Sequence, residues 1–166
     1  MNTPVAYIAL GSNVGDSPSI LRRAMDELEK LSHGRLVRSS LWQTTPVDCP
    51  PGSPLFVNAV VGLTPRPGET PESLLAKLQE LEKEFGRQPK KMLNEARPLD
   101  LDLIAFGMEV RSTPQLTLPH PRAHLRKFVL QPLAEIAPAL VLPGQTQTVS
   151  ALLAGLTSDE AIRRLG

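Results

Sequence analysis

Residues 99–106, with the sequence Leu-Asp-Leu-Asp-Leu-Ile-Ala-Phe, predict a β-strand, because they form an apolar run that ends at Gly107. Successive side chains of a strand point to opposite faces, so Asp100 and Asp102 share one face and the leucines share the other. The rise of a strand separates the Cα atoms of the two acids by roughly 6–7 Å. The apolar surroundings favour a central strand, where a pair of carboxylates needs a binding partner.

Two helices and three more strands are predicted before this strand. The first helix has Asp16 or Ser17 as its cap and Pro18 in its first turn, and the second begins at Thr70-Pro71-Glu72. The strands are predicted over residues 5–10, 36–42 and 56–63.

The resulting order, β-α-β-β-α-β, is typical of a ferredoxin-like α+β fold: an antiparallel sheet with helices on one face. Gly107 and Met108 predict a turn into a short return strand. A C-terminal α/β elaboration is expected after it. Its parts are a short helical stretch near 122–127, an apolar segment 128–142, and helical pieces at 149–156 and 158–165. Residues 1–166 are expected to form a single domain.

The composition is that of an ordinary globular domain. The chain has 166 residues, 41% of them hydrophobic, and a formal net charge of +1. This balance excludes nucleic-acid or membrane binding that depends on overall charge, and the single cysteine excludes a disulfide framework. No apolar run reaches the ~18 residues of a membrane helix, and no Lys or Arg precedes Arg22 to form a secretory signal. A cytoplasmic location is therefore expected.

Two segments, 43–55 and 87–98, are longer than ordinary connections. Each has about a dozen residues, whereas compact domains usually join their elements with ~4–6. Such long loops commonly cover binding sites, so both are predicted to be active-site lids; tolerated insertions are the alternative.

Basic side chains lie on both sides of the acidic strand in the sequence. Arg87, Lys90, Lys91 and Arg97 precede it. Two carboxylates suit Mg²⁺, which completes its shell with water and phosphate oxygens, while nearby guanidinium groups bind other phosphate oxygens. The combination indicates a polyphosphate site, although a solvated acidic face beside a solvated basic loop is the alternative. The basic and imidazole groups that follow the strand are His120, Arg122, His124, Arg126 and Lys127.

Two further groups of residues are ambiguous by themselves. The segment 11–16 links a strand to a helix, but it is not a Walker A sequence, and a tight turn accounts for it better than a phosphate loop does. Phe56 and Asn58 share one strand face, where they could stack on and hydrogen-bond a planar heterocycle. A core phenylalanine and a turn-adjacent asparagine explain them equally well.

Taken in order, the motifs of this chain resemble those of the 6-hydroxymethyl-7,8-dihydropterin pyrophosphokinase family of folate biosynthesis. The resemblance runs from residue 5 to about 143 and is most specific at Arg97-Pro98-Leu99-Asp100-Leu101-Asp102-Leu103. The other matching motifs are Gly11-Ser12-Asn13, Thr44-Thr45-Pro46-Val47, Phe56-Val57-Asn58-Ala59, Phe85-Gly86-Arg87, Leu118-Pro119-His120-Pro121-Arg122 and Glu135-Ile136-Ala137-Pro138.

The resemblance implies that ATP, as co-substrate, gives its β,γ-pyrophosphoryl group to the pterin hydroxymethyl oxygen and leaves as AMP. It implies two Mg²⁺ ions held by Asp100 and Asp102, with Arg87 and Arg97 completing the catalytic group. The implied pterin site has the ring stacked between two phenylalanines; its residues are Thr44, Pro46, Val47, Phe56, Asn58 and Phe128. The implied ATP site comprises Gln79, Glu82, Arg87, Arg97, Leu103, Thr117, His120 and Arg126.

The chain departs from the family pattern in its second long segment. Pro89 and Leu93 stand where many members have basic residues, and Ala96 stands where a proline is common. Lys90 and Lys91 are hypothesised to supply the missing charge.

A non-catalytic RNA-binding or ligand-binding module is the alternative function, because RNA-recognition sheets share the same element order. The predicted third strand lacks their aromatic run, and the near-neutral charge also opposes that interpretation. We therefore expect small-molecule partners, no nucleic acid, no membrane and a monomer.

Overall fold

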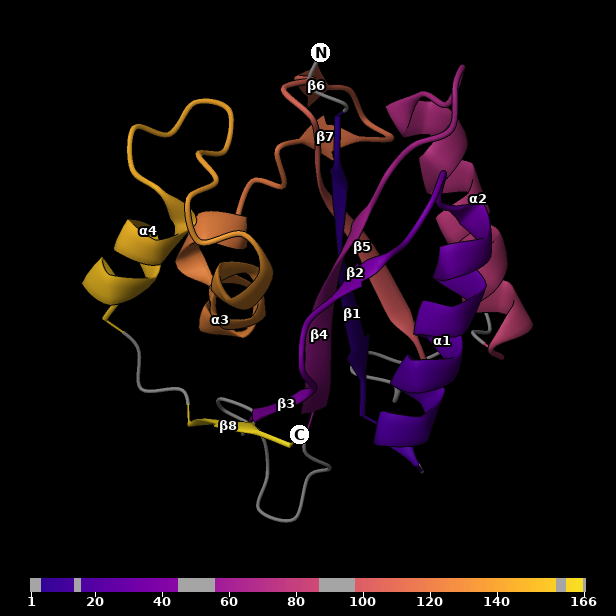
Figure 1. The fold of residues 1–166 in the computed structure, drawn as a ribbon, viewed down its shortest axis with the longest axis horizontal. Helices are drawn as coiled ribbons and strands as arrows, with labels where there is room; N and C mark the ends of the chain where they lie inside the picture. The colour runs from indigo at the N-terminus through magenta and orange to yellow at the C-terminus, as the bar shows by residue number, and fades with distance from the viewer. Residues whose placement is uncertain (1–3, 14–15, 45–55, 87–97, 158–160, 166) are drawn as a thin grey trace.

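The computed structural model describes residues 4–13, 16–44, 56–86, 98–157 and 161–165 (Figure 1). Its strands are β1 (Ala6–Ser12), β2 (Val37–Arg38), β3 (Trp42–Thr44), β4 (Phe56–Leu63), β5 (Asp100–Phe106), β6 (Arg111–Ser112), β7 (Thr117–Leu118) and β8 (Ile162–Arg164). Its helices are α1 (Ser17–Leu31), α2 (Pro71–Glu84), a 3₁₀ turn (Ala123–Leu125), α3 (Lys127–Ile136) and α4 (Val149–Gly155). Within the described part of the chain, none of these helices is long and apolar enough to cross a membrane.

The main sheet is antiparallel and has the strand order β5-β1-β4-β3-β8, with β2 also pairing with β4. Because β2 and β3 together stand for the predicted second strand, the first four strand positions are those of a ferredoxin-like sheet. The predicted α+β fold class is confirmed. β6 and β7 form a separate two-stranded sheet.

The two helices of the β-α-β-β-α-β unit begin at the residues that the sequence predicts. The Asp16 side chain accepts a hydrogen bond from the Ser19 amide at the start of α1. Thr70 caps α2, and Ser73 reciprocates in a capping box. Each cap satisfies amide groups that a helix start leaves without partners.

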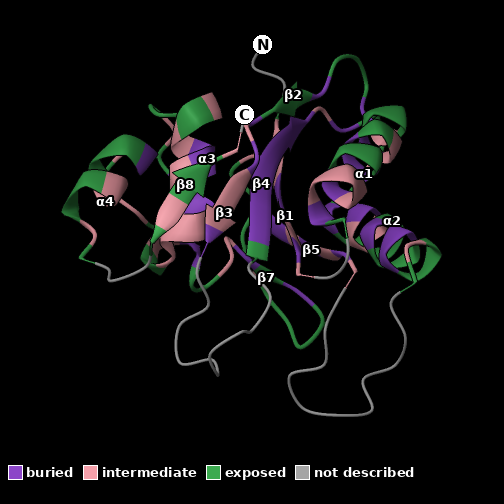
Figure 2. Ribbon diagram, turned by 90° about the horizontal axis from the view of Figure 1, so that it is seen from below, coloured by how far each residue is buried: buried purple, intermediate pink, exposed green. Residues whose placement is uncertain are grey.

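The helices lie on both faces of the sheet. α1 and α2 pack on one face, over a core that includes Ile8, Leu10 and Leu28. α3 packs on the other, where Val60, Ile104 and Leu133 are buried, and α4 packs against α3. Figure 1 shows the sheet between the two helix pairs, and Figure 2 shows β4 buried along its length apart from its first residue. The predicted one-sided helix layer is therefore completed by the C-terminal elaboration on the opposite face.

β5 is an outer strand of the sheet, so the prediction of a central strand was wrong. The apolar composition of β5 has another cause. Helix layers cover both faces of the strand, and both hydrophobic cores of the protein include β5 residues. The α2 helix and the segment before α3 also lie along its open edge, where the carbonyl of Ile104 accepts a hydrogen bond from the His120 amide at 2.8 Å.

The strand predicted over 36–42 is interrupted at Ser39. The Ser39 side chain accepts a hydrogen bond from the Val60 amide at 2.9 Å, while the Ser39 amide donates to the Val60 carbonyl. A side-chain oxygen thus replaces one backbone acceptor, and two short strands result. Residues 43 and 44 belong to β3 rather than to the predicted long loop.

Two C-terminal predictions need correction. The predicted turn at Gly107 and Met108 leads into a short strand, β6, as expected, but β6 pairs with β7 rather than returning along β5. The predicted helix over 158–165 is replaced, in its described part, by strand β8 against β3. The open edge of β3 offers unpaired backbone groups, and pairing with them outweighs the weak local helix preference. The helical pieces near 122–127 and over 149–156 are confirmed by the 3₁₀ turn and α4.

Candidate active site

The two aspartates of β5 point to the face of the sheet that α3 covers. Asp100 and Asp102 alternate with Leu101 and Leu103, which are buried in the core beneath α1 and α2. The β1 register places Asp100 opposite Gly11 and Asp102 opposite Ala9. Both aspartates are half-buried. The predicted alternation of carboxylates and leucines is thus what the strand presents.

Glu82 approaches the open edge of β5 from the side of α2. It is 8% exposed, and its carboxylate accepts a hydrogen bond from the Leu101 amide at 2.8 Å. This bond satisfies an edge amide that would otherwise need another strand. Leu75 and Gln79 lie three to seven residues earlier on α2, at helical spacing, and line the same pocket.

His120 and Arg126 approach the edge from the segment before α3. The Nδ1 atom of His120 accepts a hydrogen bond from the Arg122 amide at 3.2 Å. Burial lowers the pKa of His120, and the nearby charges of Arg126 and Arg122 lower it further. His120 is therefore neutral at neutral pH. The Arg126 guanidinium lies over the Phe128 ring, 5.5 Å from its centre.

These groups enclose a polar pocket of about 440 Å³ along β5. Carboxylates and a guanidinium line the same pocket, so it has groups that can bind cations and a group that can bind anions. The residues that line it are Leu75, Gln79, Glu82, Asp100, Leu101, Asp102, His120 and Arg126.

A second group of predicted residues lies farther along the same face of the sheet. Asn58 is 6% exposed, and its Nδ2 donates to the Thr44 hydroxyl at 3.0 Å. In the strand registers, Gly11 stands between Asp100 and Asn58. Two strand spacings separate Asp100 from Asn58, so their Cα atoms lie roughly 10 Å apart. That span suits a substrate whose flat ring is held at one end and whose reacting group reaches the other.

Phe56 and Phe128 are aromatic residues on the face of the sheet that carries Asn58. Phe56 shares the face of Asn58 by strand alternation and is 37% exposed. Phe128 lies at the start of α3 and packs against the core on that face. An exposed ring on the sheet and a half-buried ring on the helix are suited to stacking on a planar ligand.

Six predicted ATP-site and metal-site residues thus line one pocket: Gln79, Glu82, Asp100, Asp102, His120 and Arg126. Leu103 is buried on the opposite face, so only its backbone could contact a ligand there. Thr117 is exposed in β7 and is not one of the described residues lining the pocket. Arg87, Arg97, Pro46 and Val47, and most of both predicted lids, lie outside the described residues.

Sequence reasoning missed three members of the site. Leu75 and Leu101 line the pocket, and the helical spacing of Leu75 with Gln79 was a usable signal. Gly11 was interpreted as part of the link between a strand and a helix and of a family motif, but not as a residue that makes room beside Asn58. A Cβ atom at Gly11 would lie 3.2 Å from Oδ1 of Asn58, so the glycine leaves room for that amide. Only the β1–β4 register reveals this contact.

The pocket chemistry fits Mg²⁺. Mg²⁺ is commonly bound by one or two carboxylates and keeps water or phosphate oxygens at its other positions. Asp100 and Asp102 supply the carboxylates, and the pocket leaves room for the other ligands. Within the described residues no group of three or more His, Cys, Asp or Glu side chains could hold a metal by itself, so a closed structural metal site is not formed there.

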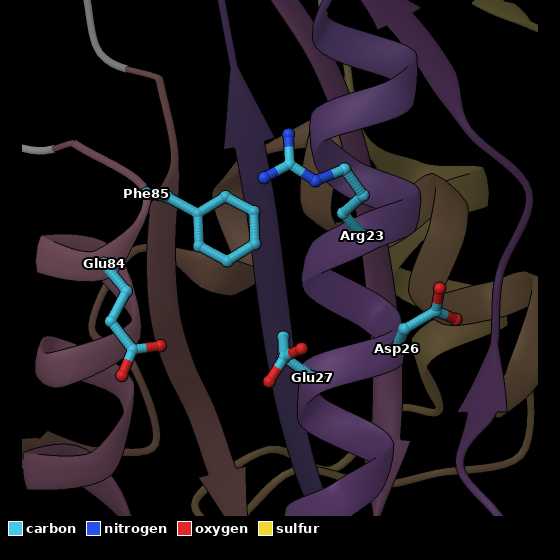
Figure 3. Close-up of a pocket in the computed structure, with 5 residues that line it drawn as sticks. All are labelled: Arg23, Asp26, Glu27, Glu84 and Phe85. Carbon is cyan, nitrogen blue, oxygen red and sulfur yellow. The ribbon is translucent and has the colours of Figure 1, made fainter.

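A second pocket, of about 310 Å³, lies between α1 and the end of α2 and contains no predicted site residue. Figure 3 shows the Arg23 guanidinium beside the Phe85 ring, 5.2 Å from its centre, with Glu27 and Glu84 nearby. This pocket shares no described lining residue with the pocket along β5, and we assign no catalytic role to its carboxylates.

Known proteins of one family are similar to this chain. Residues 7–138 match the family model described as 7,8-dihydro-6-hydroxymethylpterin-pyrophosphokinase. A 2-amino-4-hydroxy-6-hydroxymethyldihydropteridine pyrophosphokinase of Haemophilus influenzae is 38% identical over 159 residues, which are 95% of this chain and 96% of that protein. The enzyme of the same name from Pseudomonas aeruginosa is 40% identical over 138 residues, which are 82% of this chain and 83% of that protein.

Solved structures support the fold. A Plasmodium falciparum HPPK-DHPS triple mutant with SDX-DHP matches with a TM-score of 0.70 at 15% identity, and covers 92% of this chain. The wild-type HPPK-DHPS with pteroate matches with a TM-score of 0.71 at 14% identity, again over 92% of this chain. The chain spans 44% and 42% of those two longer chains.

Proposed function

The chain belongs to the 7,8-dihydro-6-hydroxymethylpterin-pyrophosphokinase family, and on that premise we propose that its reaction takes place in the pocket along β5. The reaction is pyrophosphoryl transfer from ATP to 6-hydroxymethyl-7,8-dihydropterin, in folate biosynthesis. The observation that carries the proposal is the juxtaposition of Asp100 and Asp102 with His120 and Arg126 in one pocket. A non-catalytic RNA-binding or ligand-binding module is not favoured.

The chemistry needs positioning and charge stabilisation rather than a protein nucleophile. The pterin hydroxymethyl oxygen attacks the β-phosphorus of ATP and forms a new O–P bond. The bond from that phosphorus to the oxygen bridging the α- and β-phosphates breaks, AMP leaves, and the hydroxyl proton is released.

The phosphate end of the site is proposed to lie between β5 and the segment before α3. Arg126 carries a permanent positive charge and can bind phosphate oxygens. His120 is neutral at neutral pH, so it can bind without adding charge; its Nδ1 accepts from Arg122, which leaves Nε2 as a donor. Arg87 and Arg97 are proposed as further phosphate ligands from the family resemblance, and Thr117 and the Leu103 backbone as contacts to the nucleotide. Gln79 and Glu82 are proposed to contact ATP from α2.

Asp100 and Asp102 are proposed to hold Mg²⁺. When bound, Mg²⁺ would neutralise charge on the phosphate oxygens and orient the triphosphate. The two carboxylates come from a rigid strand, so the distance between them is fixed before any substrate binds.

The pterin end of the site is proposed to lie over Asn58. Among the described residues, Thr44 takes up one amide hydrogen of Asn58, and we propose that the carbonyl oxygen and second amide hydrogen bind a heterocycle edge. Phe56 and Phe128 are proposed to stack on the ring, and Pro46 and Val47 are proposed to line the same site. The hydroxymethyl group would then point across Gly11 toward the aspartates.

The proposal is tested by measuring AMP formed from ATP, Mg²⁺ and 6-hydroxymethyl-7,8-dihydropterin. We expect AMP only when the pterin is present. A double variant, Asp100→Asn with Asp102→Asn, should lose activity by on the order of 10³-fold, because metal stabilisation contributes several kcal/mol. An exposed control, Glu109→Gln, should retain full activity. Full activity of the folded double variant would contradict the assignment of the metal site.

Five broader properties are proposed beside this one. Residues 1–166 are proposed to form a single domain whose segments 43–55 and 87–98 act as lids; most of both segments lies outside the described residues. The protein is proposed to be a cytoplasmic monomer that does not bind nucleic acid, which its formal net charge of +1 supports.

A further inference from the structure

Glu135, in the last turn of α3, holds the chain segment that leads into β3. One carboxylate oxygen accepts hydrogen bonds from the Ser40 amide at 2.9 Å and from the Trp42 indole Nε1 at 3.1 Å. The other accepts a hydrogen bond from the Ser40 hydroxyl at 2.6 Å. Residues almost a hundred positions apart in the sequence are thus joined by three bonds to one side chain.

A carboxylate is unfavourable at this position of a helix, and the three hydrogen bonds explain why Glu135 is tolerated there. A negative charge in the last turn opposes the helix dipole, which typically costs a few tenths of a kcal/mol to about 1 kcal/mol. Burial opposes ionisation, but the hydrogen bonds from Ser40 and Trp42 and the charge of Arg164 lower the pKa of Glu135. The carboxylate is therefore ionised and bonded at neutral pH.

Glu135 also connects the two sides of the proposed pterin site. Glu135 and Phe128 are seven residues apart on α3, which places them on the same side of the helix, two turns apart. On the sheet, β3 pairs Trp42 with Asn58, and the Thr44 hydroxyl accepts a hydrogen bond from the Asn58 amide. A shift of α3 against β3 would therefore move Phe128 relative to Asn58.

We propose that Glu135 is a positioning residue for the pterin substrate: it fixes β3 against α3, and so sets the distance between the Asn58 amide and the Phe128 ring. This inference rests on the proposed pterin site. None of the described residues that line the pocket along β5 bonds Glu135, but Arg126 of that pocket precedes α3 and lies over the Phe128 ring. The inference therefore predicts a larger change in KM for the pterin than in KM for ATP.

The test measures KM for the pterin, KM for ATP, and kcat in three variants. Glu135→Ala should raise KM for the pterin about tenfold, since it removes hydrogen bonds to a charged group, while KM for ATP stays within about twofold. Glu135→Gln keeps an acceptor oxygen and should recover most of that loss. Glu27→Ala, which removes an exposed helix carboxylate paired with Lys30, should change neither KM.

A second measurement does not depend on turnover. Trp42 is the only tryptophan, so the protein has a single indole N–H resonance. In Glu135→Ala this resonance should move and exchange faster with solvent, while in Glu27→Ala it should not. Pterin binding followed by tryptophan fluorescence should weaken in parallel with the rise in KM.

Two results would overturn the inference. One is an equal change of both KM values in Glu135→Ala, or no change in either, which would reduce Glu135 to a general stabilising contact. The other is an unchanged pterin KM in an Asn58→Ala variant, which would overturn the proposed pterin site and the inference with it. A raised pterin KM in Asn58→Ala, with Glu135→Ala unchanged, would overturn the inference alone.

Discussion

Gly11 lies between two polar side chains of the site, because β1 pairs it with Asp100 on one side and with Asn58 on the other. The size of the residue at this position determines how much space a substrate has between Asp100 and Asn58. A Cβ atom at this position would lie 3.2 Å from Oδ1 of Asn58, which is tighter than an ordinary contact. The glycine therefore matters for the space beside Asn58.

We expect Gly11→Ala to raise KM for the pterin, because the new methyl group displaces the Asn58 amide. The matched control is Gly62→Ala, where a Cβ atom would lie 3.3 Å from Val5 at the other end of β4, away from the site. Both variants should lose similar stability in chemical denaturation, on the order of 1 kcal/mol, as is usual for overpacking. Equal pterin KM values in the two variants would contradict the role given to Gly11.

His120 gives a pH-dependent prediction. Burial, with the charges of Arg126 and Arg122, lowers its pKa from the ordinary value of 6.5. At about pH 7.5 and above, the imidazole is neutral in the folded and unfolded chain, so its titration does not change stability there. As the pH falls below that value the unfolded chain binds the proton first, and stability falls until the folded pKa is passed.

An NMR titration of the His120 ring, assigned with a His120→Gln variant, should therefore show a midpoint below 6.5. The variant should also lose less stability than the wild type between about pH 7.5 and about pH 5.5. A midpoint at or above the ordinary value would show that the imidazole is not held neutral by its surroundings.

At the scale of elements, local signals predicted the helices and distant pairing decided the rest. The caps Asp16 and Thr70 and the apolar spacing after them act within one helix turn, so the sequence alone located α1 and α2. The Asp100–Asp102 face followed from strand alternation in the same way. The outer position of β5 and the identity of β8 depend on which strands pair, and no local pattern of residues encodes that.

The α2 helix offers a test of a local signal. Thr70→Ala removes the side-chain acceptor for the Ser73 amide and should lower the free energy of unfolding by about 1 kcal/mol. Because the change lies at the far end of α2 from Glu82, the KM for ATP should stay unchanged. Thr70→Ser, which keeps the hydroxyl, should restore most of the stability; a loss as large as that of alanine would contradict the capping explanation.

At the scale of the whole molecule, one sheet is shared by two cores. β1, β4 and β5 each contribute to the cluster beneath α1 and α2 and to the cluster beneath α3 and α4. Because both cores share these three strands, one core cannot unfold while the other stays folded. The same sheet carries the pocket along β5 and the proposed pterin site.

Denaturation should therefore be one cooperative event. The fluorescence of Trp42, which contacts α3, and the far-ultraviolet circular dichroism of the whole chain should give the same midpoint. Leu28→Ala and Leu133→Ala, one in each core, should each lower the free energy of unfolding by about 2–5 kcal/mol. Each should therefore lower the midpoint measured by both probes. Loss of the tryptophan signal before the circular dichroism signal would indicate two separate units.

The position of β5 at the rim of the sheet has one more consequence. An exposed strand edge can recruit strands from other molecules and start aggregation. Here the Glu82 carboxylate occupies the Leu101 amide, and the His120 amide occupies the Ile104 carbonyl. The contacts that line the pocket along β5 therefore also occupy two of the backbone groups that another chain would need for pairing. These polar contacts oppose the addition of a further strand at this edge of the sheet.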